Sequence, residues 1–349
     1  MNRRDVIVIG GSAGSTGPLK TLVGALPQSF SGSILIVTHV PSHGVRLLGQ
    51  VLQAKTQLKV GYPRDGDPVL PGRIYLGPAD RHLMVRDGHI VLGRGPKENM
   101  ARPAIDPLFR SAALEYGPRV VGVILSGLLN DGASGLAAVK QCGGYAIVQD
   151  LDEAEASDMP RAALAAAAVD RAAPAHEIAE LIQAQMREGA AAHARVAPPP
   201  GLKLEVEIAA GGPVSTQKTA TIAKPAPFVC PDCNGVLSEV EGEAPLRYRC
   251  QVGHALTGEV LDAVKHEQVE VALRTAMRIM EERATLVARL FEDAHDAGRN
   301  SAAQLYADRL REYRAQADVL RQAVLKLMDS EPANPAAVQD FAAEQAAKR

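Results

Sequence analysis

The chain has 349 residues, enough for more than one domain, and its formal net charge is −2, with 38 lysines and arginines against 40 aspartates and glutamates. A nearly balanced charge argues against a nucleic acid or an anionic membrane held by bulk electrostatic attraction. The first apolar run is too short for a signal peptide and no stretch is long enough to span a membrane, so we expect a cytoplasmic protein without direct membrane insertion.

The first expected element is a buried strand over residues 6–9, which runs into the glycine-rich segment 10–14 before a stretch with helical spacing. Gly10, Ser12 and Gly14 spell G-x-S-x-G, a pattern typical of a nucleophile elbow between a strand and a helix. Such a turn exposes the serine and directs the amides that follow it toward a developing oxyanion. A nucleotide phosphate loop is the alternative, but neither of its usual fingerprints, G-x-G-x-x-G or G-K-S/T, is complete here.

Strands and helices alternate through the first half of the chain. Short β-branched runs predict buried strands, and apolar residues three and four apart predict helices. The expected strands are 33–38, 120–125 and 145–148 with shorter ones between 60 and 95, and the expected helices are 45–51, 106–114, one from 133 and one from 176. This order predicts an α/β domain over residues 1–188, built on a doubly wound, mainly parallel, Rossmann-like sheet.

Two polar residues lie just past predicted central strands, as Ser12 does. They are His39 and Asp131, and the carboxyl ends of parallel strands share one edge of the sheet, where ligands bind. Taken alone, His39 fits a packed histidine and Asp131 fits a turn residue, but together with Ser12 they favour a nucleophile, a base and the group that orients the base. His43 is the competing base, but it lies beyond Pro41, toward the next expected helix.

Five stretches of the first half carry a family resemblance. They are Val-Ile-Gly-Gly-Ser-Ala-Gly-Ser (8–15), Val-Thr-His-Val-Pro (37–41), Gly-Pro-Ala-Asp-Arg-His-Leu (77–83), Arg-Pro-Ala-Ile-Asp with Leu-Phe-Arg-Ser-Ala-Ala (102–113), and Val-Ile-Leu-Ser-Gly-Leu-Leu-Asn-Asp-Gly-Ala (123–133). With them, residues 5–185 resemble the catalytic domain of the chemotaxis receptor protein-glutamate methylesterases, the CheB type. This resemblance implies hydrolysis of γ-glutamyl methyl esters on chemoreceptors or related signalling proteins, and deamidation of receptor glutamines, with no cofactor for catalysis.

The same resemblance assigns catalytic roles. The family's serine, histidine and aspartate fall on Ser12, His39 and Asp131, and its oxyanion-hole amides fall near Ala13 and Leu128. The family usually carries a receiver domain in front of the catalytic domain, whereas the catalytic strand begins at residue 5 here, which predicts a chain without that regulator.

This chain also departs from the family pattern in its loops. It has Ser-Ala-Gly-Ser where the family usually has Ser-Thr-Gly-Gly, and Leu129 replaces a glycine beside the expected site, which should narrow or reshape the pocket. One alternative is therefore a catalytically reduced scaffold that binds a partner through the esterase-like domain and the C-terminal helices. Another alternative, a nucleotide-binding oxidoreductase, leaves His39 and Asp131 unexplained.

The second half begins with an Ala/Pro-rich segment, 189–227, which we expect to be a linker with one strand over residues 202–208. A module over residues 228–257 then contains C-x2-C and C-x3-H pairs, whose spacing predicts a tetrahedral zinc site of structural type. Its ligands would be Cys230, Cys233, Cys250 and His254. Free structural cysteines are the alternative, and the acidic loop of the module argues against binding of nucleic acid.

Residues 258–329 show two stretches of apolar residues stepping by three and four, with a glycine-containing turn between them. This pattern predicts an antiparallel helical hairpin with coiled-coil-like seams. Two helices alone cover their apolar faces poorly, so we expect self-association or a separate response regulator as a partner. The tail, 330–349, is expected to be flexible.

Overall fold

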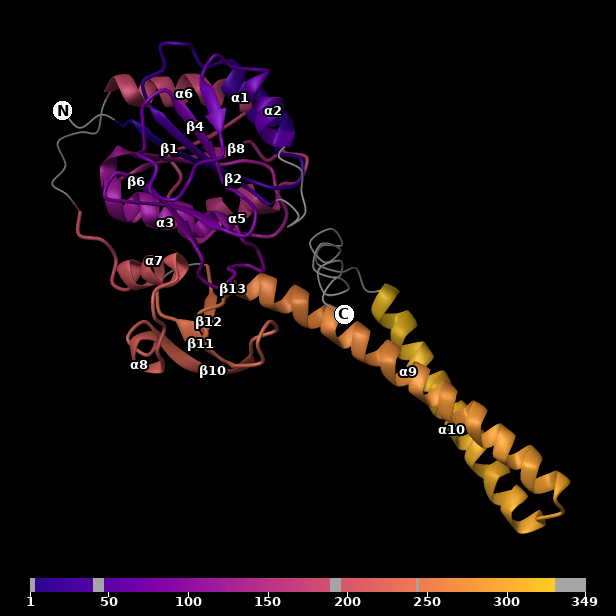
Figure 1. The fold of residues 1–349 in the computed structure, drawn as a ribbon. Helices are drawn as coiled ribbons and strands as arrows, with labels where there is room; N and C mark the ends of the chain where they lie inside the picture. Colours follow the sequence, from indigo (N-terminus) through magenta and orange to yellow (C-terminus); the bar gives the residue numbers. More distant parts are fainter. Residues whose placement is uncertain (1–3, 40–46, 189–195, 243–244, 330–349) are drawn as a thin grey trace. The chain divides into compact units, whose positions relative to one another are not determined.

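The computed structural model describes residues 4–39, 47–188, 196–242 and 245–329 (Figure 1). These residues divide into two compact units, one that reaches Leu261 and one that begins at Asp262. The first unit holds a parallel sheet and a smaller antiparallel sheet, and the second is made of two long helices. None of the described helices has the length and apolar character that crossing a membrane requires. His43 and the tail from residue 330 lie outside the described residues.

Seven parallel strands form the main sheet, in the order β3-β4-β2-β1-β7-β8-β9. Their bounds are β1 Val6–Gly11, β2 Ser33–Thr38, β3 Lys59–Gly61, β4 Arg73–Leu76, β7 Val120–Ile124, β8 Tyr145–Gln149 and β9 Arg171–Ala173. β1 lies between β2 and β7, so the chain runs from β1 toward one edge and later returns to its other side. This confirms the predicted doubly wound parallel sheet, and it creates a topological switch point beside β1, where such sheets bind ligands.

Helices cover both faces of this sheet (Figure 1). On one face lie α1 (Thr16–Gly24), α2 (Leu47–Gln53) and α6 (Ala175–Glu188), and on the other α3 (Ile105–Tyr116), α4 (Ala133–Gln141) and α5 (Asp158–Ala166). Alternate residues of β1 serve the two cores, Ile7 and Ile9 on the first face and Val6 and Val8 on the second. The unbroken apolar run of this strand therefore reflects burial on both sides.

A β-hairpin and the short helix α7 (Leu202–Ala210) pack against α3. The hairpin pairs β5 (His82–Arg86) with β6 (His89–Gly93), and the 3-10 turn Gly117–Arg119 precedes β7. Residues 202–208, expected as a strand, belong instead to helix α7, so that prediction is wrong. The sequence alternates apolar and polar residues there, but the helix buries Leu202, Glu205 and Ile208, three residues apart, because Glu205 takes part in a buried ionic cluster.

The C-terminal part of the first unit is an antiparallel sheet of four strands in sequential order: β10 (Ala223–Val229), β11 (Val236–Val240), β12 (Arg247–Cys250) and β13 (Ala255–Thr257). The one-turn helix α8 (Thr216–Thr219) precedes it. Beyond it, α9 (Gly258–Asp296) and α10 (Asn300–Asp329) form the predicted helical hairpin. The ion pair of Arg321 with Glu281 and the hydrogen bond from Arg283 to Tyr313 show that these two helices run antiparallel.

Candidate active site

The turn after β1 presents Ser12 at the carboxyl edge of the sheet. The Ser12 carbonyl accepts hydrogen bonds from the amide and the hydroxyl of Ser15, at 3.1 and 2.6 Å. Because the N–H of a trans peptide points opposite its C=O, these bonds direct the Ala13 amide away from the interior of the turn. Gly14 has φ +74°, and a Cβ there would lie 2.7 Å from Ser126 Oγ, so the turn requires glycine at this position.

His39 lies between Ser12 and Asp131. Its Nδ1 is 3.2 Å from Ser12 Oγ, and its Nε2 is 2.7 Å from Asp131 Oδ2. An ionised carboxylate only accepts hydrogen bonds, so Nε2 carries the proton and Nδ1 is left as the acceptor for the serine hydroxyl. The structure thus brings together the three residues that the sequence places after β1, β2 and β7, in the order that proton transfer from serine to histidine requires.

Asp131 is buried and accepts hydrogen bonds at both carboxylate oxygens. Oδ2 accepts from His39 and from the amide of Ile105 at 2.6 Å, and Oδ1 accepts from Asn99 Nδ2 at 2.9 Å and from the Gly132 amide at 3.0 Å. Burial alone would raise the pKa of Asp131, but the hydrogen bond and charge of His39, with the other donors, lower it below its ordinary value. Asp131 therefore stays a carboxylate, as a group that stabilises a histidine cation must.

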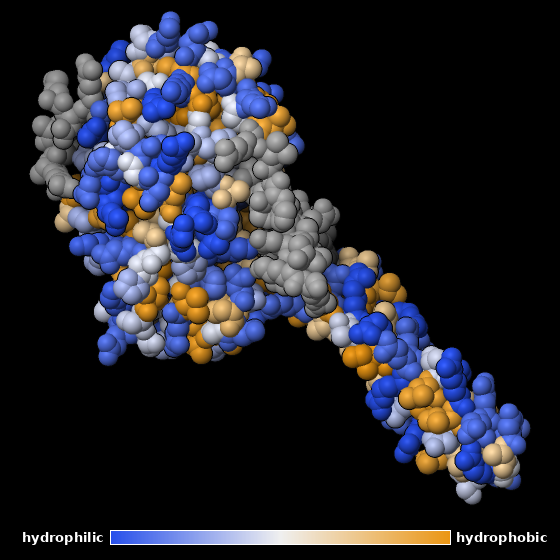
Figure 2. Space-filling view, viewed as in Figure 1, coloured by the Kyte–Doolittle hydropathy of each residue, from blue (hydrophilic) through white to orange (hydrophobic). Residues whose placement is uncertain are grey.

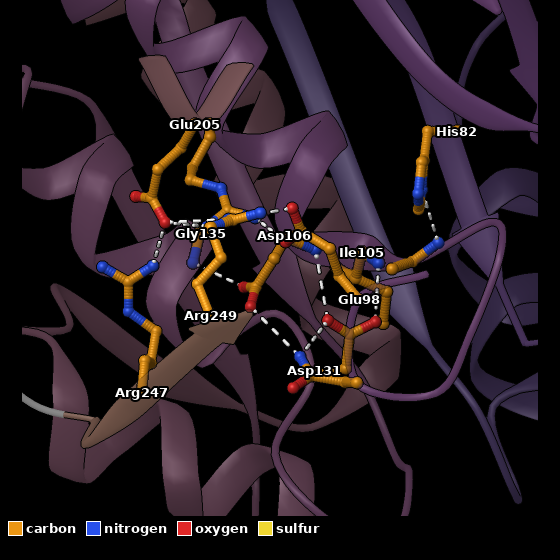
Figure 3. A network of polar contacts seen from close by, with 12 residues as sticks. His82, Glu98, Ile105, Asp106, Asp131, Gly135, Glu205, Arg247 and Arg249 are labelled. Carbon is orange, nitrogen blue, oxygen red and sulfur yellow. Dashed lines mark hydrogen bonds and ion pairs between the residues drawn. The ribbon is translucent and has the colours of Figure 1, made fainter. Parts of the chain in front are cut away.

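A second buried carboxyl group, Asp106, lies beside Asp131 (Figure 3). It accepts the Gly135 amide at 2.6 Å, and Asn99 Nδ2 lies 3.3 Å from its other oxygen. Burial, and then the charge of Asp131, raise the pKa of Asp106 to about 7. Two neighbouring carboxyl groups in one buried site thus have pKa values shifted in opposite directions, and only Asp131 faces His39.

The raised pKa predicts a pH-dependent stability. The folded chain keeps the Asp106 proton up to a pH of about 7, whereas the unfolded chain releases it near the ordinary value of 3.8. Its contribution to the free energy of unfolding is therefore complete below pH 4 and is lost as the pH rises toward 7. Relative to Asp106→Asn, the parent should lose on the order of 3 kcal/mol between pH 5 and pH 8, at about 1.4 kcal/mol per pKa unit. Denaturant unfolding measures this, with the exposed Asp152→Asn as control, and parallel curves for Asp106→Asn and the parent would contradict it.

The loop between β7 and α4 completes the rim of the site. A Cβ on Gly127 would lie 3.0 Å from Ser12 Cβ and 2.1 Å from Met159 Sδ, so this position needs glycine for close approach. Within the described parts of the chain, the amides of Ala13 and Leu128 have no hydrogen-bond acceptor, which leaves them available to a substrate oxygen. Leu129, in the same loop, adopts φ +59°.

The left-handed backbone at Leu129 predicts how the parent and its variants at this position rank in stability. This conformation costs about 1–2 kcal/mol for an L residue, and more for a β-branched one. Leu129→Gly should therefore raise the free energy of unfolding by about 1 kcal/mol, and Leu129→Val should lower it by about the same amount. Leu128 has no positive φ, so Leu128→Gly is the matched control and should destabilise the chain. Thermal unfolding tests this, and a Leu129→Gly variant less stable than the parent would refute it.

A buried ionic cluster joins α3 and α7 to the antiparallel sheet (Figure 3). Arg249 Nη2 lies 3.1 Å from Glu98 and 3.0 Å from Glu205, and Arg247 lies 2.6 Å from Glu205. Arg110 pairs with the same two glutamates. Burial alone would raise the pKa of Glu205, but the charges of Arg110, Arg247 and Arg249 hold it well below its ordinary value. The antiparallel sheet is therefore linked, through α3 and α7, to the domain of the parallel sheet. Each buried charge of this link is stabilised by the opposite charges beside it.

The four residues predicted as metal ligands also lie together. One ligand atom from each of Cys230, Cys233, Cys250 and His254 lies within 4.8 Å of all the others. His254 Nδ1 is 3.5 Å from Cys250 Sγ and 3.8 Å from Cys230 Sγ, and Cys233 Sγ is 3.7 Å from Cys250 Sγ. Tetrahedral zinc, with bonds of about 2.3 Å to sulfur and about 2.0 Å to nitrogen, separates its ligand atoms by about 3.5–3.8 Å. The donor set and its spacing therefore fit a zinc ion.

Asp232 contacts one of the four candidate metal ligands. Its carboxylate lies 3.4 Å from Nε2 of His254, the ring nitrogen that does not face the cysteines. Histidines that bind metals usually donate their second N–H to such a group, which fixes the ring.

The sequence analysis left Ser126, Asn99 and Asp106 without a role. Asp106 lies in the first turn of α3, and Ser126 and Asn99 lie in loops. All three are distant in the chain from the residues they contact, and no spacing rule connects them.

A serine, a histidine and an aspartate linked in this way at the edge of a parallel sheet define the arrangement seen in serine hydrolases. Comparison with known protein families narrows this class to one family. A family model described as CheB methylesterase matches residues 7–182. That is half of the chain, so the chain belongs to the CheB methylesterase family, as its motifs predicted.

Three relatives illustrate the match. The protein-glutamate methylesterase/protein-glutamine glutaminase 2 of Anaeromyxobacter dehalogenans is 38% identical over 50% of this chain and 52% of its own length. A putative enzyme of the same name from Leptospira interrogans is 36% identical over 51% of this chain and 92% of its own length. The crystal structure of the Thermotoga maritima CheB methylesterase catalytic domain, 31% identical, superposes with a TM-score of 0.50 over 52% of this chain and 97% of that domain. This chain thus spans about half the length of the first of these relatives.

Proposed function

We propose that this chain is a protein-glutamate methylesterase that hydrolyses γ-glutamyl methyl esters on chemoreceptors or related signalling proteins, and that it also deamidates glutamines. One observation carries the proposal, the hydrogen-bonded series Ser12–His39–Asp131 in a chain of the CheB methylesterase family. The names of the relatives supply both substrates, the methyl ester and the amide. The cytoplasm is the compartment proposed.

The geometry supports a two-step mechanism. Ser12 Oγ attacks the carbonyl carbon of the ester while its proton passes to His39 Nδ1, 3.2 Å away. The C–O bond to the methoxy group then breaks, His39 returns the proton to that oxygen, and methanol leaves. Water, deprotonated by His39, then attacks the acyl carbon and the bond from this carbon to Ser12 Oγ breaks. His39 returns the proton to Oγ, and the glutamate side chain leaves as a carboxylate. For a glutamine side chain the leaving group is ammonia.

Two groups would stabilise the charges that develop. Asp131, 2.7 Å from His39 Nε2, faces the histidine cation formed when the serine proton arrives. The amides of Ala13 and Leu128 would donate to the oxyanion of the tetrahedral intermediate. A fluorophosphonate probe tests the nucleophile directly, since it should label the parent on Ser12 and leave Ser12→Ala unlabelled. Equal labelling of both proteins would remove Ser12 from this role.

A catalytically reduced scaffold is the second candidate function, and the strained Leu129 beside the site favours it. In that case the esterase-like domain would bind a partner without turning it over. Methanol release from methylated receptor fragments separates the two candidates, because only the esterase produces it.

We also propose that Cys230, Cys233, Cys250 and His254 hold one zinc ion of structural type. Its support is the agreement between the observed ligand separations and tetrahedral coordination. Elemental analysis of the purified chain should find about one zinc per chain, and Cys250→Ala should lose it. Zinc-free protein with an intact antiparallel sheet would contradict the proposal.

The helical pair is proposed to bind a partner, another copy of the chain or a separate response regulator. Its support is the set of large apolar side chains exposed on α9 and α10, and Figure 2 shows apolar residues on the surface of these helices. The exposed residues include Ile279, Leu286, Leu305 and Val319. Light scattering should show a smaller particle for Val319→Glu than for the parent.

We keep the five-part division at residues 188, 227, 257 and 329 as a proposal for the domain boundaries.

A further inference from the structure

The cysteine-containing sheet pairs with a loop of the catalytic domain. The amide of Asn99 donates to the carbonyl of Ala255 at 2.8 Å, and the amide of Ala255 donates to the Lys97 carbonyl at 3.3 Å. Glu98 and Ala255 form a parallel bridge. Residues 97–99 therefore extend the antiparallel sheet beyond β13, and this loop is held by backbone hydrogen bonds to the cysteine module.

The Asn99 side chain continues this link to the catalytic aspartate. Its Oδ1 accepts the backbone N–H of Thr257 in β13 at 3.0 Å, and its Nδ2 donates to Asp131 Oδ1 at 2.9 Å. Asn99 has φ +49° and Met100 has φ +63°, two consecutive left-handed residues. Such conformations persist only where surrounding contacts hold them, and they cluster at functional sites. Asn99 thus spans from β13 to Asp131 with both ends of its amide in use.

A second connection reaches the residue before Asp131. Thr257 Oγ1 donates to Asn130 Oδ1 at 2.6 Å, and Asn130 Nδ2 donates to Glu259 at 2.8 Å. Thr257 and Asn130 are both buried. One residue of β13 therefore contacts the side chain of Asn130, which precedes Asp131, and reaches the carboxylate of Asp131 through the side chain of Asn99.

The candidate metal ligands lie at the base of β13. His254 precedes this strand directly, and Cys250 ends the neighbouring strand β12. The Cys250 amide donates to the His254 carbonyl at 3.0 Å, and Arg249 donates to the Gly253 carbonyl at 2.8 Å. A metal bound to Cys250 and His254 would close this tight turn and fix the start of β13.

We propose that Asn99 is a positioning residue for Asp131, and that metal occupancy of the Cys230, Cys233, Cys250 and His254 group sets the rate of hydrolysis by holding Asn99 through β13. This inference rests on the proposed esterase function. Without the metal, the β12–β13 turn loses its clamp, the Thr257 amide no longer fixes Asn99, and Asp131 loses a donor at Oδ1. A displacement of about 1 Å in a catalytic group costs about 10²-fold in rate.

A double-perturbation cycle on the full chain tests the coupling. The parent and Asn99→Ala are each assayed with zinc bound and after removal of zinc by a chelator. In the parent, removal of zinc should lower kcat for methyl-ester hydrolysis about 10–100-fold with little change in KM. Asn99→Ala with zinc bound should show the same loss. Removal of zinc from Asn99→Ala should add at most the several-fold loss expected of the Asn130 connection, because the connection through Asn99 is already broken.

Proton NMR supplies a readout that does not depend on turnover. The proton shared by His39 Nε2 and Asp131 should give a low-field resonance in the zinc-bound parent, and this resonance should weaken or shift in Asn99→Ala and after zinc removal. Thr257→Val, which keeps the backbone amide but loses the hydroxyl bond to Asn130, should lower kcat several-fold with its zinc content unchanged. These two variants keep the test valid if the chelator unfolds the chain.

Three outcomes would overturn the inference: an unchanged kcat and resonance in the folded zinc-free parent, additive losses in the cycle, or Asn99→Ala with the parent's kcat and resonance. Failure of the proposed function looks different. In that case the zinc-bound parent would release no methanol, while the resonance and fluorophosphonate labelling of Ser12 would still report whether Asn99 and zinc hold the site.

Discussion

Ser12→Ala is expected to slow methyl-ester hydrolysis on the order of 10⁴-fold or more, because no other described hydroxyl lies within hydrogen-bonding distance of His39. His39→Ala should cause a loss of the same order, since the members of such a set act as a unit. Rates of methanol release measure both, and Ser301→Ala, on the exposed surface of α10, is the control with unchanged rate. A Ser12→Ala variant as fast as the parent would refute the mechanism.

Asp131→Asn should be nearly as severe, and the contacts of Asp131 show why. Both of its oxygens face donors, Oδ2 the Ile105 amide and His39, and Oδ1 the Asn99 side chain and the Gly132 amide. An asparagine must point its NH₂ group at one of these sets. With the NH₂ toward His39, Nε2 must become the acceptor, which moves the ring proton to Nδ1 and removes the base that faces Ser12. With the NH₂ at the position of Oδ1, it faces the Asn99 side chain and the Gly132 amide, which are also donors. The loop must then shift to separate these three donors.

Much of the candidate site was predictable because it depends on strand ends. Ser12 and His39 follow apolar runs that are buried on both faces, and such runs are readable in sequence. Parallel strands then bring their carboxyl ends to one edge, so residues 27 positions apart in the chain meet at 3.2 Å. The grouping of the four candidate metal ligands was predictable for a different reason, since each knuckle of the module is a local turn with a characteristic spacing.

The contacts that hold the site were not predictable, because they depend on tertiary packing. Asn99 contacts Thr257, 158 positions away, and nothing in the local sequence of either residue indicates the other. The same limit explains α7. The alternating segment 202–208 has strand periodicity, and only the arginines of α3 and β12 make burial of Glu205 favourable. Tertiary charge pairing there overrides the local pattern.

The buried glutamate of α7 carries the largest expected effect on stability. Glu205 has a relative exposure of 5%, and three arginines, Arg110, Arg247 and Arg249, contact one of its oxygens at 3.1, 2.6 and 3.0 Å. Loss of its charge leaves Arg110 and Arg249 with Glu98 as their remaining carboxylate partner in the cluster, and it removes the carboxylate that Arg247 contacts. Removal of one partner from a buried ion pair typically costs about 3–5 kcal/mol. Glu205→Gln should therefore lower the free energy of unfolding by about that amount.

Glu207→Gln is the matched control, because Glu207 lies on the exposed side of the same helix and should change stability by less than about 0.5 kcal/mol. The pH dependence gives a second readout. The pKa of Glu205 is depressed in the fold, so its contribution is present above the ordinary glutamate value of 4.5 and is lost as the pH falls below it. The difference between the parent and Glu205→Gln should therefore shrink in acid. Denaturant unfolding from pH 7 to pH 3 measures this, and a Glu205→Gln variant as stable as Glu207→Gln at pH 7 would show that the cluster does not join the two sheets energetically.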